Sequence, residues 1–485
     1  MFEKDQNATS GHGRLFQWLD RRTGLRGLLH KALDEPIPGG AKFAYVFGSG
    51  LLFVFLSQII TGVFLAMYYV PSADHAHTTV AYITKEVTAG SLLRSIHSYG
   101  SSLIVILIVL HLGQTFLYGS YKGRRELLWM SGCILLALML GMAFTGYLLP
   151  WDQKAYFATA VGTNITSEIP VIGSWIKQLM RGGNEMGTLT VSRFYVAHVF
   201  LIPALIFAFV ASHVFLFRKA GAAGPVKEDP IEPRLPTEPF YPRQVLIDLA
   251  FTLVLIGVLW VLAHFHPVEL GPEADPSDTQ YLPRPEWYYR PFFQWLKYWP
   301  GASSIIGIVL IPLIVGAAFF FLPFLDRSSE RRPWRRPLSV GIFGSVLAGI
   351  VSLGVLSYRG DARDPGVAAQ LKTQNEETKT FMQAAFEPEP AAHTLQAANV
   401  ALANPDAAKG KDIFQQQSCN VCHGDNAEGT AAAPKLIGIS NKFPPEKIEA
   451  LLHHPTAKMT EGGMTPVDLP PADLSKLIAY LTSLK

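Results

Sequence analysis

The sequence predicts an all-α membrane protein with seven transmembrane helices and a separate extramembrane domain at its C-terminus. The chain has 485 residues, of which 49% are hydrophobic and only 16% are charged, whereas soluble domains average about 25% charged residues. Seven apolar stretches reach or approach the ~20 residues needed to cross a bilayer. After residue 356 the chain turns polar, and residues 406–485 have the pattern of a compact unit.

The apolar stretches define the domain organisation. They cover residues 43–70, 91–118, 127–149, 191–217, 245–265, 304–325 and 337–356. Residues 1–42 are basic and amphipathic, so we expect them to lie on the membrane surface and contain no cleavable signal peptide. We expect the first four spans to form one bundle (43–220) and the other three a second part (221–357). A linker (358–405) would lead to the C-terminal domain (406–485).

Two of the spans each carry a pair of histidines. His97 and His111 are 14 residues apart, and His198 and His213 are 15 apart. In a helix the members of such a pair lie roughly 21 Å apart along the axis and on nearly the same side. A single buried histidine is usually structural, but ionisable groups at membrane depth are costly and usually functional. Because haem iron accepts axial histidine, the two pairs predict two bis-histidine haem b sites: His97 with His198, and His111 with His213.

Glycines recur at the same interval on the two neighbouring spans. Gly48 and Gly62 lie 14 residues apart on the first span, and Gly132 and Gly146 lie 14 apart on the third. A glycine lets the backbone approach a flat macrocycle where a Cβ would collide. Glycines in membrane helices also mark helix–helix packing. Their match to the histidine interval favours a haem-binding role.

Loop charges predict the orientation in the membrane. Lys and Arg number 20 in the N-terminal segment and the loops near 119–126, 218–244 and 326–336, against seven in the loops 71–90, 150–190 and 266–303. Because cytoplasmic loops are enriched in Lys and Arg, the N-terminus is predicted to be cytoplasmic. Seven crossings then place the C-terminal domain outside, with the His97–His198 pair near the outer face.

The C-terminal domain carries Cys419-Asn-Val-Cys422-His423, the motif of c-type haem attachment. The two thiols would bond the porphyrin, and His423 would be the proximal ligand. A CxxC redox or zinc site is the alternative. We expect Met464 to provide a sulfur ligand on the far side of the haem, with Met459 as the alternative. Such a ligand raises the reduction potential.

Together these features resemble cytochrome b of the bc1/b6f class of quinol-oxidising complexes. The resemblance covers roughly residues 40–356 and is carried by the histidines, the glycine pairs, GYLLPW (146–151) and PEWY (285–288). Three details resemble the b6f type. They are the 15-residue spacing of the second histidine pair, the segment RKAGAAGP (218–225) that follows it, and the presence of seven spans rather than eight. Val46 stands where that type has a cysteine that tethers a third haem, so no such haem is expected. The C-terminal domain resembles a small class I cytochrome c.

The resemblance implies a quinol-oxidising site at the outer face, between the PEWY loop and the end of the third span. Glu286 would accept a quinol proton, with Tyr147 and Tyr288 shaping the pocket. An ordinary interfacial turn is the alternative, since Trp and Tyr favour that depth. Arg94, one turn before His97, is expected to pair with a haem propionate or else to extend to the interface as a snorkelling arginine.

The quinone-reducing site is less defined. Relatives of the mitochondrial type use a Lys–Asp pair at the start of the fifth span, where this chain has Arg243 and Gln244. The candidates are Ser49, Arg218, Lys219, Arg243 and Asp248. The enrichment of basic residues on the cytoplasmic side explains the basic ones equally well.

By resemblance, the chain would be the cytochrome b subunit of a quinol:cytochrome c oxidoreductase in a bacterial inner membrane, building a proton gradient. The expected partners are quinone, a further c-type cytochrome or oxidase, a second copy of the complex, and a Rieske iron–sulfur protein. The Rieske protein would be a separate chain because no cysteines remain here for a cluster. We expect no nucleic-acid partner. The alternatives are a dihaem membrane anchor of a dehydrogenase or hydrogenase, and a transporter with a histidine proton relay.

Overall fold

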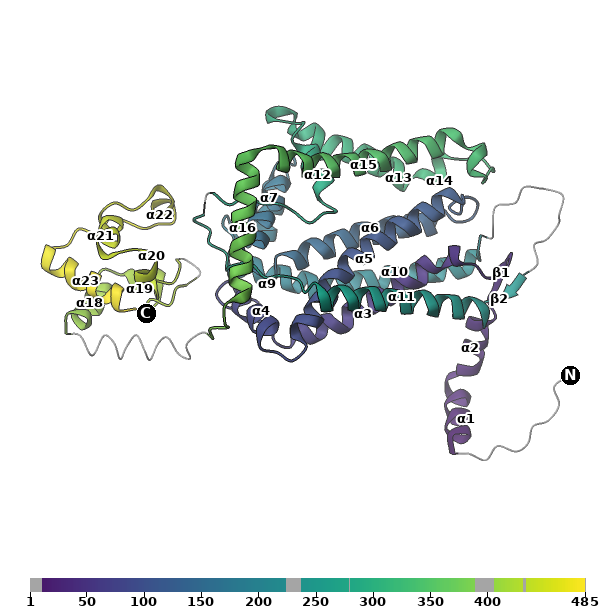
Figure 1. The fold of residues 1–485 in the computed structure, drawn as a ribbon, viewed down its shortest axis with the longest axis horizontal. Helices are drawn as coiled ribbons and strands as arrows, with labels where there is room; N and C mark the ends of the chain where they lie inside the picture. Colours follow the sequence, from purple (N-terminus) through teal and green to yellow (C-terminus); the bar gives the residue numbers. More distant parts are fainter. Residues whose placement is uncertain (1–10, 224–236, 279, 389–404, 431–432, 485) are drawn as a thin grey trace. The chain divides into compact units, whose positions relative to one another are not determined.

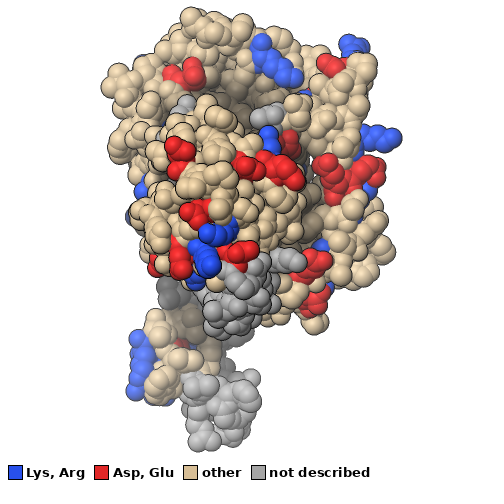
Figure 2. Space-filling view, turned by 90° about the vertical axis from the view of Figure 1, so that its left-hand side faces the viewer, with Lys and Arg blue, Asp and Glu red and all other residues tan. Residues whose placement is uncertain are grey.

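A computed structural model describes residues 11–223, 237–278, 280–388, 405–430 and 433–484. The chain divides into two compact units, Met1–Phe386 and Glu387–Lys485. Both are helical, apart from a short antiparallel pair of strands, β1 (Pro36–Pro38) and β2 (Thr237–Pro239). The predicted all-α class is confirmed. On the face shown in Figure 2, acidic and basic side chains are interspersed among large uncharged areas.

Seven helices of the described residues are long and apolar enough to cross a membrane, as predicted. They are Phe43–Ala66 (containing α3, Val46–Ala66), Gly90–Leu117 (α5), Glu126–Tyr147 (α6), Thr188–Ala220 (containing α9, Thr188–Val196, and α10, Ile202–Ala220), Arg243–Phe265 (α11), Gly301–Phe320 (containing α13, Ile311–Phe320) and Pro337–Arg363 (α15). The last helix continues beyond residue 356 into charged sequence. It ends before Pro365, because the ring of a proline disfavours the helical conformation for the residue that precedes it.

The helix with the second histidine pair contains a π-helical turn, Ala197–Leu201, that includes His198. A π turn accommodates one extra residue within an α-helix. It therefore explains how histidines 15 apart can match a pair 14 apart on the neighbouring helix. Pro203, just after the turn, has no N–H to donate to the preceding helical turn.

The first four spans and α11 pack as one body. Helices α3 and α5 lie side by side, α6 packs on α10, and α11 covers α3 and α5 (Figure 1). Val54, Ile104, Leu107 and Leu255 are buried where α3, α5 and α11 meet. Large apolar side chains such as Phe200 are exposed on the outside of the spans, where a bilayer would cover them.

Short helices at one end of the spans build the platform for the candidate site. They are α4 (Ala76–Lys85), α7 (Gln153–Ser167), α8 (Gly173–Arg181) and α12 (Arg290–Leu296). The Asp152 carboxylate caps α7 by accepting from the Ala155 N–H at 2.8 Å, and it also accepts from the Gly271 N–H at 3.1 Å. This residue therefore joins the start of α7 to the loop that follows α11.

The segment 358–405 was expected to be a linker, but its first part is packed on this platform. Helix α16 (Pro365–Gln383) crosses the ends of the spans in Figure 1. Lys85 Nζ donates to the carbonyls of Phe381 and Ala384 at 2.6 and 2.8 Å. Phe381 and Phe386 pack with Val80 in one apolar cluster. Apolar side chains at the end of α16 thus extend the first unit to residue 386.

The second unit consists of α18 (Pro405–Gln416), α19 (Cys419–His423), α20 (Ile439–Lys442), α21 (Pro445–His453), α22 (Ala457–Glu461) and α23 (Pro471–Ser483). Helices α18 and α23 cross at Gly410, where a Cβ would lie only 2.0 Å from the Lys476 carbonyl oxygen. Phe414 and Tyr480 are buried beside this crossing with the ring centroids 5.5 Å apart. The close crossing therefore requires glycine.

A buried ion cluster joins the four-helix bundle to the later spans at their opposite end. Lys122 Nζ and Tyr121 Oη donate to the Asp326 carboxylate at 2.8 and 2.5 Å, and the Arg336 guanidinium lies 3.9 Å away. Burial alone would raise the pKa of Asp326, but the hydrogen bonds from Lys122 and Tyr121 lower it. The carboxylate therefore stabilises the fold above its ordinary pKa and loses this contribution as the pH falls through the lowered value.

Replacing Lys122 by methionine should destabilise the first unit by about 3 kcal/mol, because the substitution removes a cation from a buried pair. The side chains of Lys122 and Asp326 are only 5% and 13% exposed. Lys379→Met is the control, since its pair with Glu376 is exposed and should contribute less than about 1 kcal/mol. Thermal unfolding of the purified complex in detergent measures both. Equal losses would contradict a special role for the buried cluster.

Candidate functional site

The histidines of each predicted pair are brought together by α5 and the helix containing α10. The ring centroids of His97 and His198 lie 6.1 Å apart with an interplanar angle of 76°. A metal ion held at about 2 Å from one nitrogen of each ring separates the ring centres by roughly 6 Å. This spacing is compatible with axial ligation of one iron by both histidines. Bis-histidine ligation by this pair stays a prediction that the geometry supports.

Each of the four glycines lies against one histidine ring. A Cβ on Gly146 would lie 2.4 Å from His198 Cε1, and one on Gly62 would lie 3.2 Å from His97 Cε1. The corresponding distances are 3.4 Å for Gly132 and His213, and 3.6 Å for Gly48 and His111. Gly146 therefore makes room for the imidazole itself and Gly62 does so to a smaller degree, whereas the distances at Gly132 and Gly48 are those of ordinary contact.

Hydroxyl groups beside the glycines hold two of the imidazoles. Thr61 Oγ1 lies 2.9 Å from His97 Nδ1, and Ser131 Oγ lies 2.8 Å from His213 Nδ1. Both hydroxyls donate their own proton to a backbone carbonyl, at 2.8 Å in each case. The oxygens must therefore accept from Nδ1–H. Such a bond fixes the tautomer and leaves Nε2 to bind a metal.

The other two histidines differ from this pattern. His198 Nδ1 lies 3.0 Å from the Met142 carbonyl oxygen, and Thr145 Oγ1 is farther away at 3.4 Å. His111 Nδ1 is buried with no hydrogen-bond partner among the described residues. The residue before its glycine is Phe47, whereas a hydroxyl residue precedes each of the other three. Sequence analysis missed this Ser/Thr–Gly signal, although it is legible in the sequence.

Arg94 is placed by the loop that follows α11. Its guanidinium donates to the carbonyls of Val268 and Glu269 at 2.8 and 3.0 Å. These bonds join the start of α5 to that loop. Pairing of Arg94 with a haem propionate stays a prediction, and its described hydrogen bonds go to backbone carbonyls.

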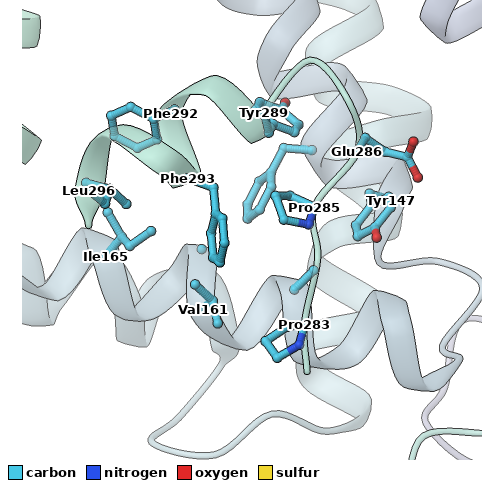
Figure 3. A pocket seen from close by; sticks show the side chains of 13 residues that line it. Tyr147, Val161, Ile165, Pro283, Pro285, Glu286, Tyr289, Phe292, Phe293 and Leu296 are labelled. Atoms are coloured by element: carbon cyan, nitrogen blue, oxygen red, sulfur yellow. The ribbon is translucent and has the colours of Figure 1, made fainter. Parts of the chain in front are cut away.

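An apolar cavity of about 200 Å³ lies where the end of α6, helix α7, the PEWY loop and α12 meet (Figure 3). Its lining includes Phe144, Tyr147, Val161, Pro285, Phe293 and Leu296. Glu286 is the one carboxylate among the described residues of the lining. A mostly apolar cavity with few polar groups is typical of a site for an apolar ring-shaped ligand.

The polar groups of the cavity lie on its Tyr147 side. In Figure 3 the Glu286 carboxylate points away from Phe293, and its Oε1 lies 2.8 Å from Lys154 Nζ. The Tyr147 hydroxyl is buried and has no partner among the described residues. The structure therefore brings Glu286 and Tyr147 together as predicted, and it adds Lys154, which sequence analysis did not single out.

The two half-buried tyrosines that follow Trp287 differ in their relation to the cavity: Tyr289 lines it, whereas Tyr288, which was predicted to shape the pocket, is not among its lining residues. Tyr289 Oη donates to the Leu140 carbonyl at 2.7 Å and joins the loop to α6. Burial raises the pKa of both Tyr288 and Tyr289. Their hydroxyls therefore stay protonated at neutral pH, and neither can act there as a phenolate base.

One carboxylate holds both ends of the PEWY loop. Asp361, near the end of α15, accepts two hydrogen bonds from Arg284 at 2.9 Å each and one from Arg290 at 2.7 Å. These arginines flank Pro285–Tyr289. Two parallel N–H···O bonds restrict the relative orientation of the groups as well as their distance. Sequence analysis missed Asp361, because nothing local connects it with a loop some 70 residues earlier.

The quinone-reducing candidates separate into two groups. Ser49 of α3 reaches the carboxylate of Asp248 in α11, and Gln244 donates to the same carboxylate at 2.8 Å. Arg218 instead pairs with Glu35 at 3.1 Å, and Arg243 pairs with Glu238 at 3.6 Å. Lys219 lies over the ring of Phe215. The structure thus brings Ser49 and Asp248 together, while both arginines have glutamate partners.

In the second unit the CxxCH motif forms the short helix α19. His423 Nδ1 lies 2.8 Å from the Pro434 carbonyl oxygen, which leaves Nε2 free for the predicted haem ligation. Cys419 and Cys422 are free thiols. Met464 packs against the buried core of this unit, and its N–H donates to the Met459 carbonyl at 2.9 Å. Contact with the core favours Met464 as the sulfur ligand.

Comparisons with known proteins agree with this arrangement. Family models match residues 32–221 (Cytochrome b/b6/petB), 273–373 (Cytochrome b(C-terminal)/b6/petD) and 407–485 (Cytochrome c). Cytochrome b of Rhodospirillum rubrum is 34% identical over 75% of this chain and 90% of its own. The chain therefore belongs to the cytochrome b family, with a cytochrome c domain in the same polypeptide. Members of these two families carry haem b and haem c.

Other relatives cover different parts of the chain. Cytochrome b/c1 of Bradyrhizobium diazoefficiens is 35% identical over 70% of this chain. The match covers 50% of the length of that relative. The menaquinol:cytochrome c reductase cytochrome b subunit of Bacillus subtilis is 38% identical over 44% of this chain and 99% of its own. A solved chain described as hyperthermophilic respiratory Complex III has a TM-score of 0.64 and 28% identity, covering 76% of this chain and 97% of that one.

Replacing Thr61 by valine should raise the reduction potential of one b haem. The substitution removes the acceptor for His97 Nδ1–H, so the imidazole becomes a weaker donor to iron. A bond worth about 1 kcal/mol corresponds to on the order of 40 mV for one electron. Redox titration of the b-haem absorbance measures the shift. Thr159→Val, which removes another buried hydroxyl, should leave both b potentials unchanged, and a shift there would contradict the assignment.

Replacing Met464 by leucine should lower the reduction potential of the c haem, because a sulfur ligand raises that potential. Met459→Leu is the matched control and should leave the potential unaltered. Redox titration of the c-type absorbance band distinguishes the two. The reverse result would assign the ligand to Met459.

Proposed function

We propose that this chain is the central subunit of a quinol:cytochrome c oxidoreductase that oxidises quinol in the cavity beside Glu286. The observation that carries the proposal is an apolar cavity with one carboxylate at its edge, in the same unit as two pairs of intramembrane histidines. A quinol needs an apolar binding site, a proton acceptor and an electron acceptor. The relatives named menaquinol:cytochrome c reductase support this assignment.

The proposed haem b sites are two bis-histidine pairs. His97 and His198 hold one haem, and His111 and His213 hold the other, with a glycine against each imidazole. Bound haem supplies one-electron transfer. Three of these imidazoles are restricted in orientation by a hydrogen bond at Nδ1, whereas His111 Nδ1 has no partner among the described residues.

Proton transfer is assigned to Glu286. Its carboxylate lies at the edge of the cavity and is 31% exposed. A carboxylate in this position can take a proton from a quinol hydroxyl and release it to water. Tyr147 offers a buried hydroxyl without a described partner, which can hydrogen-bond a ligand oxygen. Tyr289 lines the wall of the site, and Tyr288 is its neighbour in the loop.

The proposed direction of transfer follows from loop charge. The face with fewer Lys and Arg is assigned to the outside of a bacterial inner membrane, so protons from quinol leave on that side. The two histidine pairs would hold the haems that supply electron transfer across the membrane, and Ser49 and Asp248 are the candidates for a quinone-reducing site at the inner face. The transfer thereby builds a proton gradient.

The other electron is assigned to partners outside the membrane. A Rieske iron–sulfur protein would accept it and pass it to the haem c domain, held by Cys419, Cys422 and His423. That domain would deliver the electron to a further c-type cytochrome or an oxidase. A homodimeric complex is proposed by analogy with the family. A dihaem dehydrogenase anchor is less well supported, because it would not need the cavity beside Glu286.

Replacing Glu286 by glutamine should slow quinol oxidation at least tenfold, because the amide cannot accept a proton at that point and general base catalysis contributes about 10²–10⁴-fold. Haem spectra should be unchanged, since Glu286 does not contact the histidines. Steady-state oxidation of a short-chain quinol by the purified complex measures the effect. Unchanged turnover would remove Glu286 from the mechanism.

A further inference from the structure

We propose that Lys154 is a positioning residue of the quinol site that holds the Glu286 carboxylate in its outward, ionised state. The inference rests on the proposed function, because it assigns a partner to the proton acceptor. Lys154 Nζ lies 2.8 Å from Glu286 Oε1, and the two residues are 132 positions apart in the chain. Their side chains are 49% and 31% exposed, so the pair lies between the cavity and solvent.

The position of Lys154 in its helix needs explanation. It is the second residue of α7 (Gln153–Ser167), just after the capping residue Asp152. A cation in the first turn faces the positive end of the helix dipole and is disfavoured there. The Asp152 carboxylate is engaged by the N–H groups of Ala155 and Gly271. Glu286 therefore supplies the negative charge that stabilises this lysine.

The other titratable groups around Glu286 do not provide a second cation. From α6, Tyr147 faces the carboxylate, and Lys154 Nζ also lies 5.7 Å from the centroid of that ring. From its own loop, Tyr288 faces it. Asp152 and Tyr281 lie near Tyr147. Among these described neighbours Lys154 alone carries a positive charge, so it alone favours the ionised carboxylate by attraction.

The pair links the protonation of Glu286 to its orientation. As a carboxylate, Glu286 is attracted to Lys154 and points away from Phe293 and the cavity (Figure 3). Once it has accepted a quinol proton, the carboxyl group is neutral and the attraction is lost. Release of the proton to water restores the pair. Lys154 thereby promotes deprotonation on the solvent side and returns the carboxylate to the state that can accept the next proton.

The test is the pH profile of quinol oxidation by the purified complex, with a short-chain quinol as reductant. Lys154→Met removes the cation that attracts the ionised carboxylate of Glu286. The acidic limb of the pH profile, over which kcat/KM rises with pH, should therefore move to higher pH. The movement of the limb should exceed any that Lys379→Met causes in the same assay. Activity at alkaline pH should approach that of the unchanged protein. Lys154→Arg keeps the cation and should restore the profile.

Controls separate this role from a structural one. Lys379→Met removes the cation of an exposed Lys–Glu pair in α16 and should leave the profile in place. Lys154→Gln is a second, polar variant that should shift the limb in the same direction. In a Glu286→Gln background, Lys154→Met should cause no further shift. Infrared difference spectra should show the protonated carboxyl band of Glu286 persisting to higher pH in Lys154→Met.

Each contrary outcome identifies what has failed. A uniform loss of turnover at every pH, with no movement of the limb or of the carboxyl band, would overturn the role of Lys154. If the acidic limb in Lys154→Met moves no farther than it does in Lys379→Met, the proposed role of Lys154 is likewise overturned. If Glu286→Gln retains full turnover, the proposed role of Glu286 as proton acceptor is wrong. Any effect of Lys154→Met would then reflect only the loss of a surface charge.

Discussion

The contact between a glycine on one helix and an imidazole on the next is the constraint on which the membrane unit depends. Gly146 and Gly62 lie against His198 and His97 so closely that a Cβ would enter, or nearly enter, the ring. The approach sets the distance between α3 and α5, and between α6 and α10. It also brings Thr61 within hydrogen-bonding distance of His97. One packing requirement therefore positions the imidazole and, at His97, gives its Nδ1 a hydrogen-bond partner.

The candidate quinol site depends on a different kind of connection. Its walls come from α6, α7 and α12, and the carboxylate of Glu286 comes from a loop that has no regular structure of its own. Asp361 holds that loop at both ends through Arg284 and Arg290, and Tyr289 holds it to α6. These bonds restrict the positions that the loop can take, and a group held by such supporting contacts is positioned more precisely than one on a free loop.

Helix α16 has a comparable role within the first unit. Its apolar end covers Val80 and Leu270, next to the 266–273 loop that Arg94 and Asp152 also bind. Several separate side chains thus stabilise the same loop, which leads into the PEWY segment. The contacts that hold this loop therefore lie in the same part of the first unit as the candidate site.

The sequence by itself determined the features that depend on local periodicity: the seven spans, the spacing of four histidines and four glycines, and the CxxCH motif. Each of these is legible because a helix converts residue spacing into direction and depth. Only the tertiary structure decided the pairs that join distant segments. Lys154 with Glu286 and Asp361 with Arg284 lie 132 and 77 residues apart. No helical repeat relates them, so the packing of the spans alone brings these charges together.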